Sequence, residues 1–356
     1  SGVVLAGCSS GGSTASLGLA ASEPAAAEAE VEAPALDGAA AEAAPESAAI
    51  ATQTRTVPSE VNGCQIKPGT YCKDGNLSGA DLSGVDLSGA DLRGVNVTGV
   101  NLSGANLTGA EVSWIKGAGA IFTGANFTNA KFSRTGMSAP NFSNANLAGV
   151  DMSWSNLDGA NFSGANLTGA SLYRTSLRKA DLTNQNLMST DLRHTNMSGA
   201  NLVGASLLGA QMFGSDLTGA NVSGVDLTGA DVRATLTDAD LSGANLTKAD
   251  LSYTKMANAK LSKAILVNAI MPYANLNSAD LSGADLSGAK MIRNDMRNAN
   301  LSGANLTNVY MGGVNLEGAN LRGADLTGAN LERAPMSGAT WTDGRVCAPG
   351  SRGSCD

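Results

Sequence analysis

Few residues of this chain could catalyse a reaction, and their spacing does not favour catalysis. His194 is the only histidine, and many of the 31 acidic residues recur at intervals of five. A positioned pair of carboxylates can transfer protons in a reaction, but here any such pair follows from the repeat. No phosphate-binding loop, metal-ligand spacing or nucleophile motif stands out. We therefore expect no enzyme activity, no cofactor and no metal site.

The five-residue interval extends over about three quarters of the chain. Residues 81–110 read DLSGVDLSGADLRGVNVTGVNLSGANLTGA, in which a small residue, Asp or Asn, Leu, Ser or Thr, and Gly recur in that order. Leu82 would point inward, Ala90 would let neighbouring sides approach, and Gly84 would supply the backbone conformation of a tight corner. One unit buries too little apolar surface alone, so only stacked units complete a core.

This phrase resembles the consensus of the pentapeptide-repeat family, A(D/N)LxX. The resemblance implies an all-β fold, a right-handed quadrilateral β-helix with four pentapeptides, or twenty residues, in each coil. Residues 75–343 contain 54 units, which predicts about 13 coils and, at ~4.8 Å per coil, a rod roughly 65 Å long. The unit at residues 230–233 has only four residues. It should kink the helix locally without ending it.

Composition and charge exclude several classes of protein. The chain is 43% hydrophobic but only 4% aromatic, so a core built from large side chains is not expected. Its net charge is −8, yet residues 75–343 hold 21 acidic and 18 basic residues. A nearly neutral body argues against a nucleic-acid binder and against an acidic surface that imitates DNA.

The pattern of the first sixty residues predicts a targeting signal and a linker. Leu5-Ala6-Gly7-Cys8 resembles the bacterial lipobox, so residues 1–8 would be the end of a lipoprotein signal and Cys8 the lipidated residue. Ser9 in the next position implies the outer membrane. Residues 9–60 are rich in Ala and Glu and interrupted by prolines, which predicts a disordered tether.

The remaining four cysteines flank the repeats in two pairs, each with a separation of eight. They are Cys64 and Cys72 in an N-terminal cap, residues 61–74, and Cys347 and Cys355 in a C-terminal cap, residues 344–356. Of the three possible pairings, we favour one loop closed over each end of the rod, in an oxidising compartment. The alternative, four thiolates on one zinc ion, would require opposite ends of the rod to meet.

A coil of twenty residues would bring the outward aromatic residues onto one face. Five phenylalanines and Trp341 occupy inward positions, and Tyr71 belongs to the cap. The other seven aromatics share one face: Trp114, Trp154, Tyr173, Phe213, Tyr253, Tyr273 and Tyr310. The corner of that face reads, coil by coil, Gly94, Trp114, Arg134, Trp154, Arg174, His194, Gly214, Tyr253, Tyr273, Arg293, Gly313 and Arg333.

Aromatic and guanidinium groups would thus alternate at the strand spacing, within reach of cation–π contacts. This position favours a stacking role for His194 over catalysis. In the next small position, Thr135, Ser155, Thr175, Thr195 and Ser215 replace the usual Ala. We expect their hydroxyls to bond to one another or to the backbone.

Two interpretations of the aromatic and basic face remain open. Its side chains could simply satisfy one another, or they could form a binding strip for a glycan or an anionic partner. Together with the lipobox, the second interpretation predicts a structural or interaction protein of the bacterial cell envelope. It would be an outer-membrane lipoprotein, periplasmic or surface-exposed, presenting this face to an envelope polymer or protein.

Two alternative functions have less support. Some members of the family act as gyrase-binding DNA mimics, but those are strongly acidic, whereas this body is nearly neutral. An ice-binding or surface-binding solenoid would use outward Ser and Thr rows, which the family consensus alone produces. We expect no nucleic-acid partner.

Overall fold

The computed structural model describes residues 57–355. The predicted lipobox, its Cys8 and nearly all of the predicted linker lie outside these residues. None of the described segments is a helix long and apolar enough to cross a membrane.

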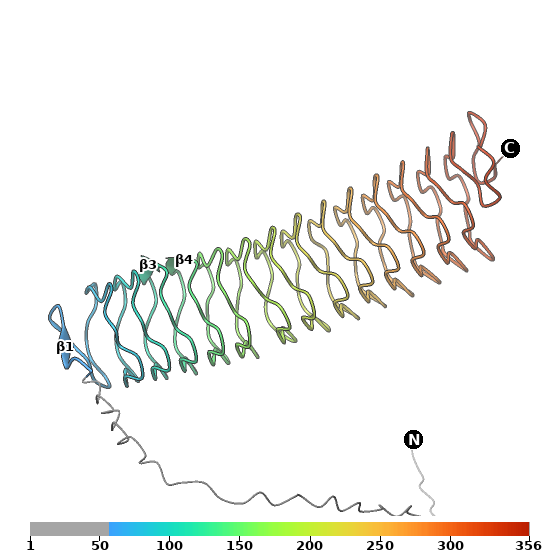
Figure 1. The fold of residues 1–356 in the computed structure, drawn as a ribbon. Coiled ribbons are helices and arrows are strands. Elements are labelled where there is room, and N and C mark those ends of the chain that lie inside the picture. The colour runs from blue at the N-terminus through green and yellow to red at the C-terminus, as the bar shows by residue number, and fades with distance from the viewer. Residues whose placement is uncertain (1–56, 356) are drawn as a thin grey trace, which may run out of the picture. The chain divides into compact units, whose positions relative to one another are not determined.

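The repeat body is a β-helix in which every coil pairs with the next (Figure 1). Single-residue parallel bridges join positions twenty residues apart, for example Asn101 to Ile121 and Asn106 to Asn126. Within residues 57–355, only two positions of the parallel ladder widen into strands, β3 (Lys116–Ala118) and β4 (Gly136–Ser138), which pair in parallel. The all-β solenoid predicted from the five-residue phrase is confirmed by this ladder.

Large and small apolar side chains alternate in the core. Leu82 and Leu87 are fully buried, as are the small residues Ala90 and Ala105. Five inward phenylalanines pack in a cluster with ring centroids 5.0 to 6.4 Å apart: Phe122, Phe127, Phe132, Phe142 and Phe162. Each fully buried Leu or Phe contributes about 1.5–3 kcal/mol before the entropy of ordering is subtracted. Trp341 is only partly buried.

The polar residues and the glycine of each five-residue repeat stabilise the turns. The carboxamide oxygen of Asn106 accepts a hydrogen bond from the amide of Thr108 at 3.2 Å, and the amide of Ala110 donates to the carbonyl of Leu107 at 3.0 Å. Gly109 between them has φ 66°, as the third residue of a type II turn requires. Asn or Asp and Gly therefore recur because both favour this turn.

The four-residue unit shortens one coil to nineteen residues. Bridges join Asp216 to Thr235 and Asp231 to Asp250, and the interval of twenty resumes with Thr235 and Lys255. Val232 and Ala234 stay buried, so the residue that is missing comes from the outward corner. The helix continues through this coil, as predicted.

The N-terminal end begins with a hairpin. Strands β1 (Glu60–Val61) and β2 (Cys64–Gln65) pair antiparallel around Asn62 and Gly63, whose φ values of 48° and 82° suit a two-residue hairpin turn. The parallel ladder starts at Tyr71, which pairs with Asp91. The ladder therefore begins one five-residue unit before the repeats counted from residue 75, and Cys72 fills an inward position in place of Leu.

The C-terminal segment turns back along the last coils. Val346 pairs antiparallel with Thr340, and Arg352 pairs antiparallel with Pro335. Disulfides join Cys347 to Cys355 at this end and Cys64 to Cys72 at the other. Each end of the parallel ladder is thus covered by a segment that the chain itself supplies.

Candidate functional site

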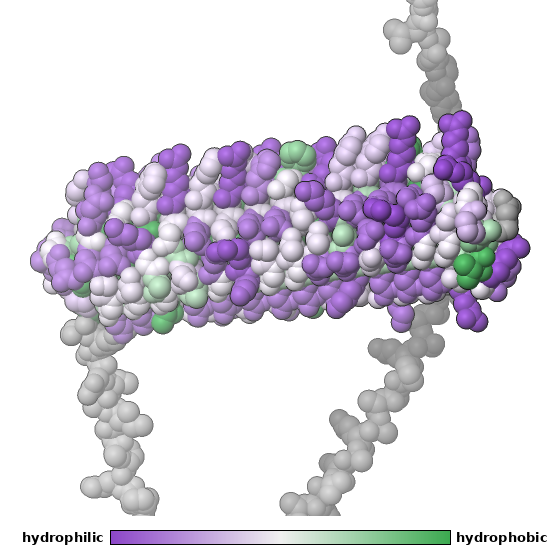
Figure 2. Space-filling view, turned by 90° about the horizontal axis from the view of Figure 1, so that it is seen from above, coloured by the Kyte–Doolittle hydropathy of each residue, from purple (hydrophilic) through white to green (hydrophobic). Residues whose placement is uncertain are grey.

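One corner of the β-helix carries a line of bulky side chains, which we call the corner column. It consists of Gly94, Trp114, Arg134, Trp154, Arg174, His194, Gly214, Tyr253, Tyr273, Arg293, Gly313 and Arg333. Backbone hydrogen bonds keep these residues in register. The amide of Trp154 donates to the carbonyl of Tyr173 at 2.9 Å, and the amide of His194 donates to the carbonyl of Phe213 at 3.0 Å. Figure 2 shows that the surface in view is mostly hydrophilic, with isolated hydrophobic side chains.

The backbone of the corner column is the one that glycine adopts elsewhere. Trp114 has φ 64°, Trp154 60° and Tyr253 59°, close to the 66° of Gly109 at another corner. A non-glycine residue in this left-handed conformation costs about 1–2 kcal/mol, and a bulky one is unusual there. The turn therefore does not call for these side chains, and their presence needs another reason.

The N-terminal half of the column is a nearly continuous series of stacked groups. The guanidinium of Arg134 lies 5.1 Å from the ring of Trp114, and that of Arg174 lies 4.5 Å from the ring of Trp154. Edge-to-face contacts then run from Trp154 to Tyr173 at 6.1 Å, to His194 at 5.8 Å and to Phe213 at 5.5 Å. His194 thus lies between two aromatic rings, in the stacking position that the sequence indicated.

The C-terminal half of the column is sparser. Tyr253 and Tyr273 stack in parallel with centroids 5.2 Å apart. Arg293 and Tyr310 make no ring contact in the part of the chain described, but both line one small hollow of about 210 Å³. Tyr310 lies on the preceding flat side and not at the corner, since it pairs with Lys290 and Asn330 in the ladder. Nine of the eleven predicted residues therefore form three separate stacked groups, and Arg293 and Tyr310 lie outside them.

These side chains remain open to solvent despite their contacts. The exposed fraction is 56% for Trp114, 51% for Trp154 and 70% for Tyr253. A line of exposed aromatics is unusual on a surface that is otherwise polar, and such residues often mark contact sites.

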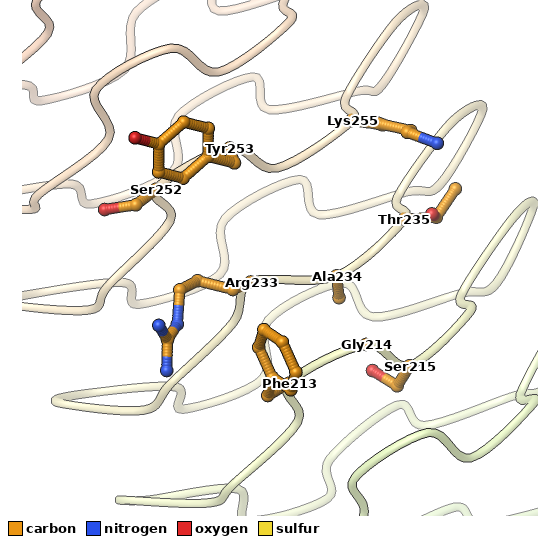
Figure 3. Close-up of a pocket in the computed structure, with 9 residues that line it drawn as sticks. All are labelled: Phe213, Gly214, Ser215, Arg233, Ala234, Thr235, Ser252, Tyr253 and Lys255. Carbon is orange, nitrogen blue, oxygen red and sulfur yellow. The ribbon is translucent and has the colours of Figure 1, made fainter.

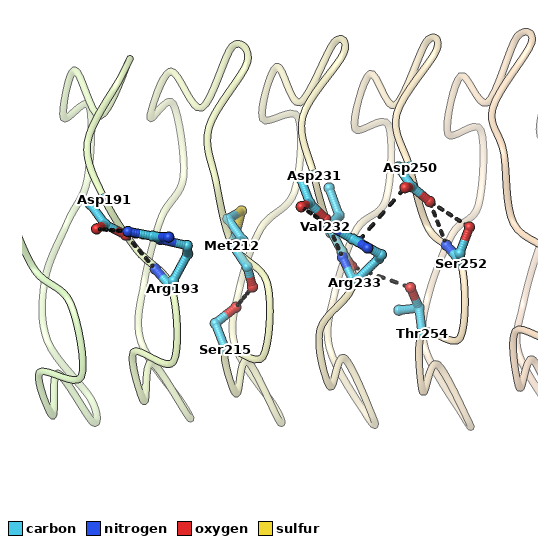
Figure 4. A network of polar contacts seen from close by, with 10 residues as sticks. All are labelled: Asp191, Arg193, Met212, Ser215, Asp231, Val232, Arg233, Asp250, Ser252 and Thr254. Atoms are coloured by element: carbon cyan, nitrogen blue, oxygen red, sulfur yellow. Dashed lines mark hydrogen bonds and ion pairs between the residues drawn. The ribbon is translucent and has the colours of Figure 1, made fainter.

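Some of the arginines on this face are neutralised by neighbouring carboxylates. Arg193 holds Asp191 through two hydrogen bonds of 2.8 and 2.7 Å, and Arg233 holds Asp231 in the same way, with Asp250 at 3.7 Å (Figure 4). Hydrogen bonds from these guanidiniums lower the pKa values of Asp191 and Asp231. Sequence reasoning missed these pairs, although Asp-x-Arg within the phrase signals them.

Other cations on this face lack such a partner. Arg134, Arg174 and Arg293 form no ion pair with any described residue. The face is therefore mixed in charge, with unneutralised guanidiniums spaced along the corner.

Buried hydroxyl groups support the corner from beneath. Thr175 and Thr195 donate to the carbonyls of Met152 and Leu172 in the preceding coil, both at 2.8 Å, and Ser215 donates to the carbonyl of Met212 at 2.7 Å. The expectation that these hydroxyls bond to one another or to the backbone is confirmed for Ser155, Thr175, Thr195 and Ser215, whereas the buried hydroxyl of Thr135 has no partner among the described residues. Asn294 continues the same column, but its buried amide atoms find no partner in the described part of the chain.

Three hollows lie along the corner column. The first, about 510 Å³, is lined by Lys73, Asp74, Arg93, Gly94, Trp114 and Lys116. The second, about 280 Å³, opens where the nineteen-residue coil lacks a corner residue (Figure 3). The third is the hollow beside Arg293 and Tyr310. Among residues 57–355, no group of His, Cys, Asp and Glu could hold a metal ion.

Comparison with protein families gives a match over the whole repeat body. A family model described as pentapeptide repeats matches in eight copies, at residues 71–109, 98–138, 141–172, 165–202, 195–233, 232–268, 269–308 and 304–340. A search of curated proteins finds no match.

Solved structures that match include HetL from the cyanobacterium Nostoc, described as a pentapeptide-repeat protein involved in the regulation of heterocyst differentiation. It is 32% identical, covering 75% of this chain and 92% of HetL, with a TM-score of 0.16. QnrB1, described as a plasmid-mediated fluoroquinolone resistance protein, is 21% identical, covering 60% of this chain and 90% of QnrB1, with a TM-score of 0.25. Rfr23 from the cyanobacterium Cyanothece is 25% identical, covering 38% of this chain and 89% of Rfr23, with a TM-score of 0.20.

Proposed function

The chain belongs to the pentapeptide-repeat family, and on that premise we propose that it is a non-enzymatic interaction protein of the bacterial cell envelope. In this proposal, the right-handed, four-sided rod presents its corner column to a glycan polymer of the envelope. The observation that carries the proposal is the left-handed backbone at Trp114, Trp154 and Tyr253. Each of these bulky side chains stands where glycine would be free of strain, and each is at least half exposed.

The attachment of the rod to the membrane rests on the first sixty residues. Lipidation of Cys8 would anchor the chain to the outer membrane, since one lipid-modified end holds a protein at a membrane without spanning it. Residues 9–60 would act as a tether that lets the rod extend away from the membrane surface. The two disulfides at the ends of the rod are consistent with an oxidising compartment.

A glycan fits the corner column better than a nucleic acid or an acidic protein surface does. Aromatic rings recur along one line, and of the cations on this face Arg193 and Arg233 are neutralised by Asp191 and Asp231, so the positive charge left at Arg134 and Arg174 is discontinuous. A phosphate polymer would call for continuous positive charge. Sugar chains combine apolar ring faces with hydroxyls, which suits alternating aromatic and polar groups.

The corner column can be tested by removing its two tryptophans. We expect Trp114→Ala with Trp154→Ala to leave thermal unfolding nearly unchanged and to reduce cosedimentation with purified cell-wall glycan severalfold. The matched control is Ile121→Ala with Ile265→Ala, which removes two exposed apolar side chains from other sides of the rod. Equal retention of both double variants, or no retention of the wild type, would contradict the proposal.

The envelope location has a separate test. Fractionation of cells that produce the full-length precursor should place the wild type with the outer membrane, and Cys8→Ser should release it into the soluble fraction. Recovery of unlipidated wild type in the cytosol would defeat the envelope proposal and favour the gyrase-binding alternative, which a supercoiling assay with purified gyrase would then examine.

A further inference from the structure

The hollow in the middle of the corner column exists because one corner residue is missing. In the nineteen-residue coil, Arg233 is followed directly by the buried Ala234, and no side chain stands at the corner between Gly214 and Tyr253. The resulting space of about 280 Å³ is lined by Phe213, Gly214, Ser215, Arg233, Ala234, Thr235, Ser252, Tyr253 and Lys255 (Figure 3). Its size lies just below the roughly 300–1,000 Å³ range of sites for drug-sized ligands, which suits one small ring.

Tyr253 gives this hollow an open aromatic surface. One face of its ring is covered by the parallel ring of Tyr273, at 5.2 Å and 7°. The side chain is still 70% exposed, more than the other aromatics of the corner column. The electron-rich face of an aromatic ring attracts weakly positive C–H groups, and one face of a pyranose ring presents such groups.

The polar groups around the hollow differ in charge from one side to the other. Arg233 is held by Asp231 and Asp250, and its guanidinium lies 5.0 Å from the ring of Phe213. Lys255, across the hollow, has no ion-pair partner among the described residues. The hydroxyls of Thr235 and Tyr253 likewise make no hydrogen bond within the described region. Lys255 and the hydroxyl of Thr235 thus lie on one side of the hollow, and the neutralised Arg233 lies on the other (Figure 3).

We propose that this hollow is a subsite for a single pyranose ring with an anionic substituent. The ring stacks on Tyr253, the substituent meets the ammonium of Lys255, and the ring hydroxyls reach Thr235. The backbone of Gly214 and the small side chain of Ala234 form the floor, which lets the ring approach the corner closely. This inference rests on the proposed glycan-binding function and names one sugar position within it.

The test uses two small probes that differ only in the group at C6. Methyl β-glucuronide carries a carboxylate on its pyranose ring, and methyl β-glucoside does not. Ligand-observed NMR titration of the full-length chain at neutral pH should give saturable, weak binding of the glucuronide and weaker binding of the glucoside. Tyr253→Ala should weaken binding of both probes about tenfold, whereas Tyr253→Phe should retain it. Lys255→Met should remove the preference for the charged probe and leave the glucoside unaffected.

A second variant changes the hollow without altering any of its side chains. Inserting one glycine between Arg233 and Ala234 restores a coil of twenty residues and a normal corner, which should abolish binding of both probes. Circular dichroism and thermal unfolding check that the insertion folds. If it does not fold, the substitutions at Tyr253 and Lys255 decide the question. Ile265→Ala, on another side of the rod, is the matched control and should bind as the wild type does.

The outcomes separate this subsite from the wider function. Equal affinity for both probes, no saturable binding of the glucuronide, or unchanged binding by Tyr253→Ala would overturn the subsite. If cell-wall glycan is still retained through Trp114 and Trp154 in that case, only the subsite fails and the proposed function stands. Loss of both forms of binding in the wild type would overturn both.

Discussion

The corner column and the other three corners share one backbone conformation but carry opposite kinds of side chain. Gly109, at another corner, has φ 66°, and Trp114, five residues later along the chain, has φ 64°. The non-glycine residues at the other corners are small or flexible, such as Asn129, Ser189 and Lys248. The turn therefore tolerates bulky groups at one corner without requiring them. The bulky side chains of the corner column are thus not a requirement of the fold.

The largest loss of stability should come from adding a methyl group at a glycine of the corner column, with a glycine at another corner as the comparison. A Cβ at Gly214 would lie 2.5 Å from Nδ1 of His194, whereas a Cβ at Gly219 would meet nothing within 4 Å. Both residues have positive φ, so Gly219→Ala should cost about 1–2 kcal/mol. Gly214→Ala should cost roughly 1 kcal/mol more, because the imidazole must move. Urea unfolding of both variants measures the difference in the free energy of unfolding. Equal losses of stability would show that the imidazole of His194 does not pack against Gly214.

Two buried polar residues beneath the corner column should change the free energy of unfolding in opposite directions when replaced by alanine. Asn294→Ala removes two buried amide atoms that have no partner among the described residues, and we expect a gain of about 1 kcal/mol, since an unmatched buried polar group costs ~1–3 kcal/mol. Thr175→Ala removes the donor to the carbonyl of Met152 and should lose about 1 kcal/mol. Chemical denaturation of the two variants checks this. Destabilisation by both would indicate that Asn294 is satisfied in solution.

Acid should weaken the ion pairs that border the corner column. The pKa values of Asp191, Asp231 and Asp295 are lowered chiefly by hydrogen bonds from Arg193, Arg233 and Arg297. A carboxyl whose pKa is lower in the folded state contributes stability above its unfolded pKa of about 3.9 and loses it as the pH falls through the folded value.

The urea midpoint should therefore stay constant from about pH 7 to pH 5 and fall below about pH 4. Because these pairs are partly exposed, each contributes a fraction of about 1 kcal/mol. Asp191→Asn with Asp231→Asn should flatten the decline; an identical decline in this variant would assign it to other carboxyls.

The smallest change in stability should come from placing glycine, the usual residue of the other corners, in the corner column. Trp114→Gly relieves a left-handed conformation worth about 1–2 kcal/mol, but it loses the contact with Arg134 and adds the backbone entropy of glycine, each about 0.5–1 kcal/mol. The free energy of unfolding should therefore stay within about 1 kcal/mol of the wild type. A clear loss of stability would instead support a purely structural role for the stacked side chains.

The repeat made much of the fold predictable, because each letter of the phrase has one physical role. Leu82 and Ala90 are buried as expected, and the interval of twenty residues that aligns Trp114 with Trp154 is present in the bridges. The start of the ladder at Tyr71 was missed since the sequence around Cys72 departs from the phrase. The cysteine in the place of Leu was nevertheless a usable signal.

The candidate site was less predictable than the fold, because it depends on the directions that side chains take. The four-residue unit was visible in the sequence, but the hollow beside it was not. It depends on Arg233 turning toward Phe213 and Asp231, and on Tyr253 stacking on Tyr273. Likewise, the break between Arg134 and Trp154 does not follow from their alternation along the corner.

The covered ends bear on how the rod resists proteolysis. In a linear array each coil contacts only its neighbours, so a terminal coil, which has one neighbour, would fray first and expose chain to a protease. Here the antiparallel segment at Val346 and Arg352 and the hairpin before Tyr71 occupy those positions. A single cut between Cys347 and Cys355 would also leave both pieces joined by their disulfide. Digestion should therefore be slow at the tips and should proceed only after a coil inside the array opens.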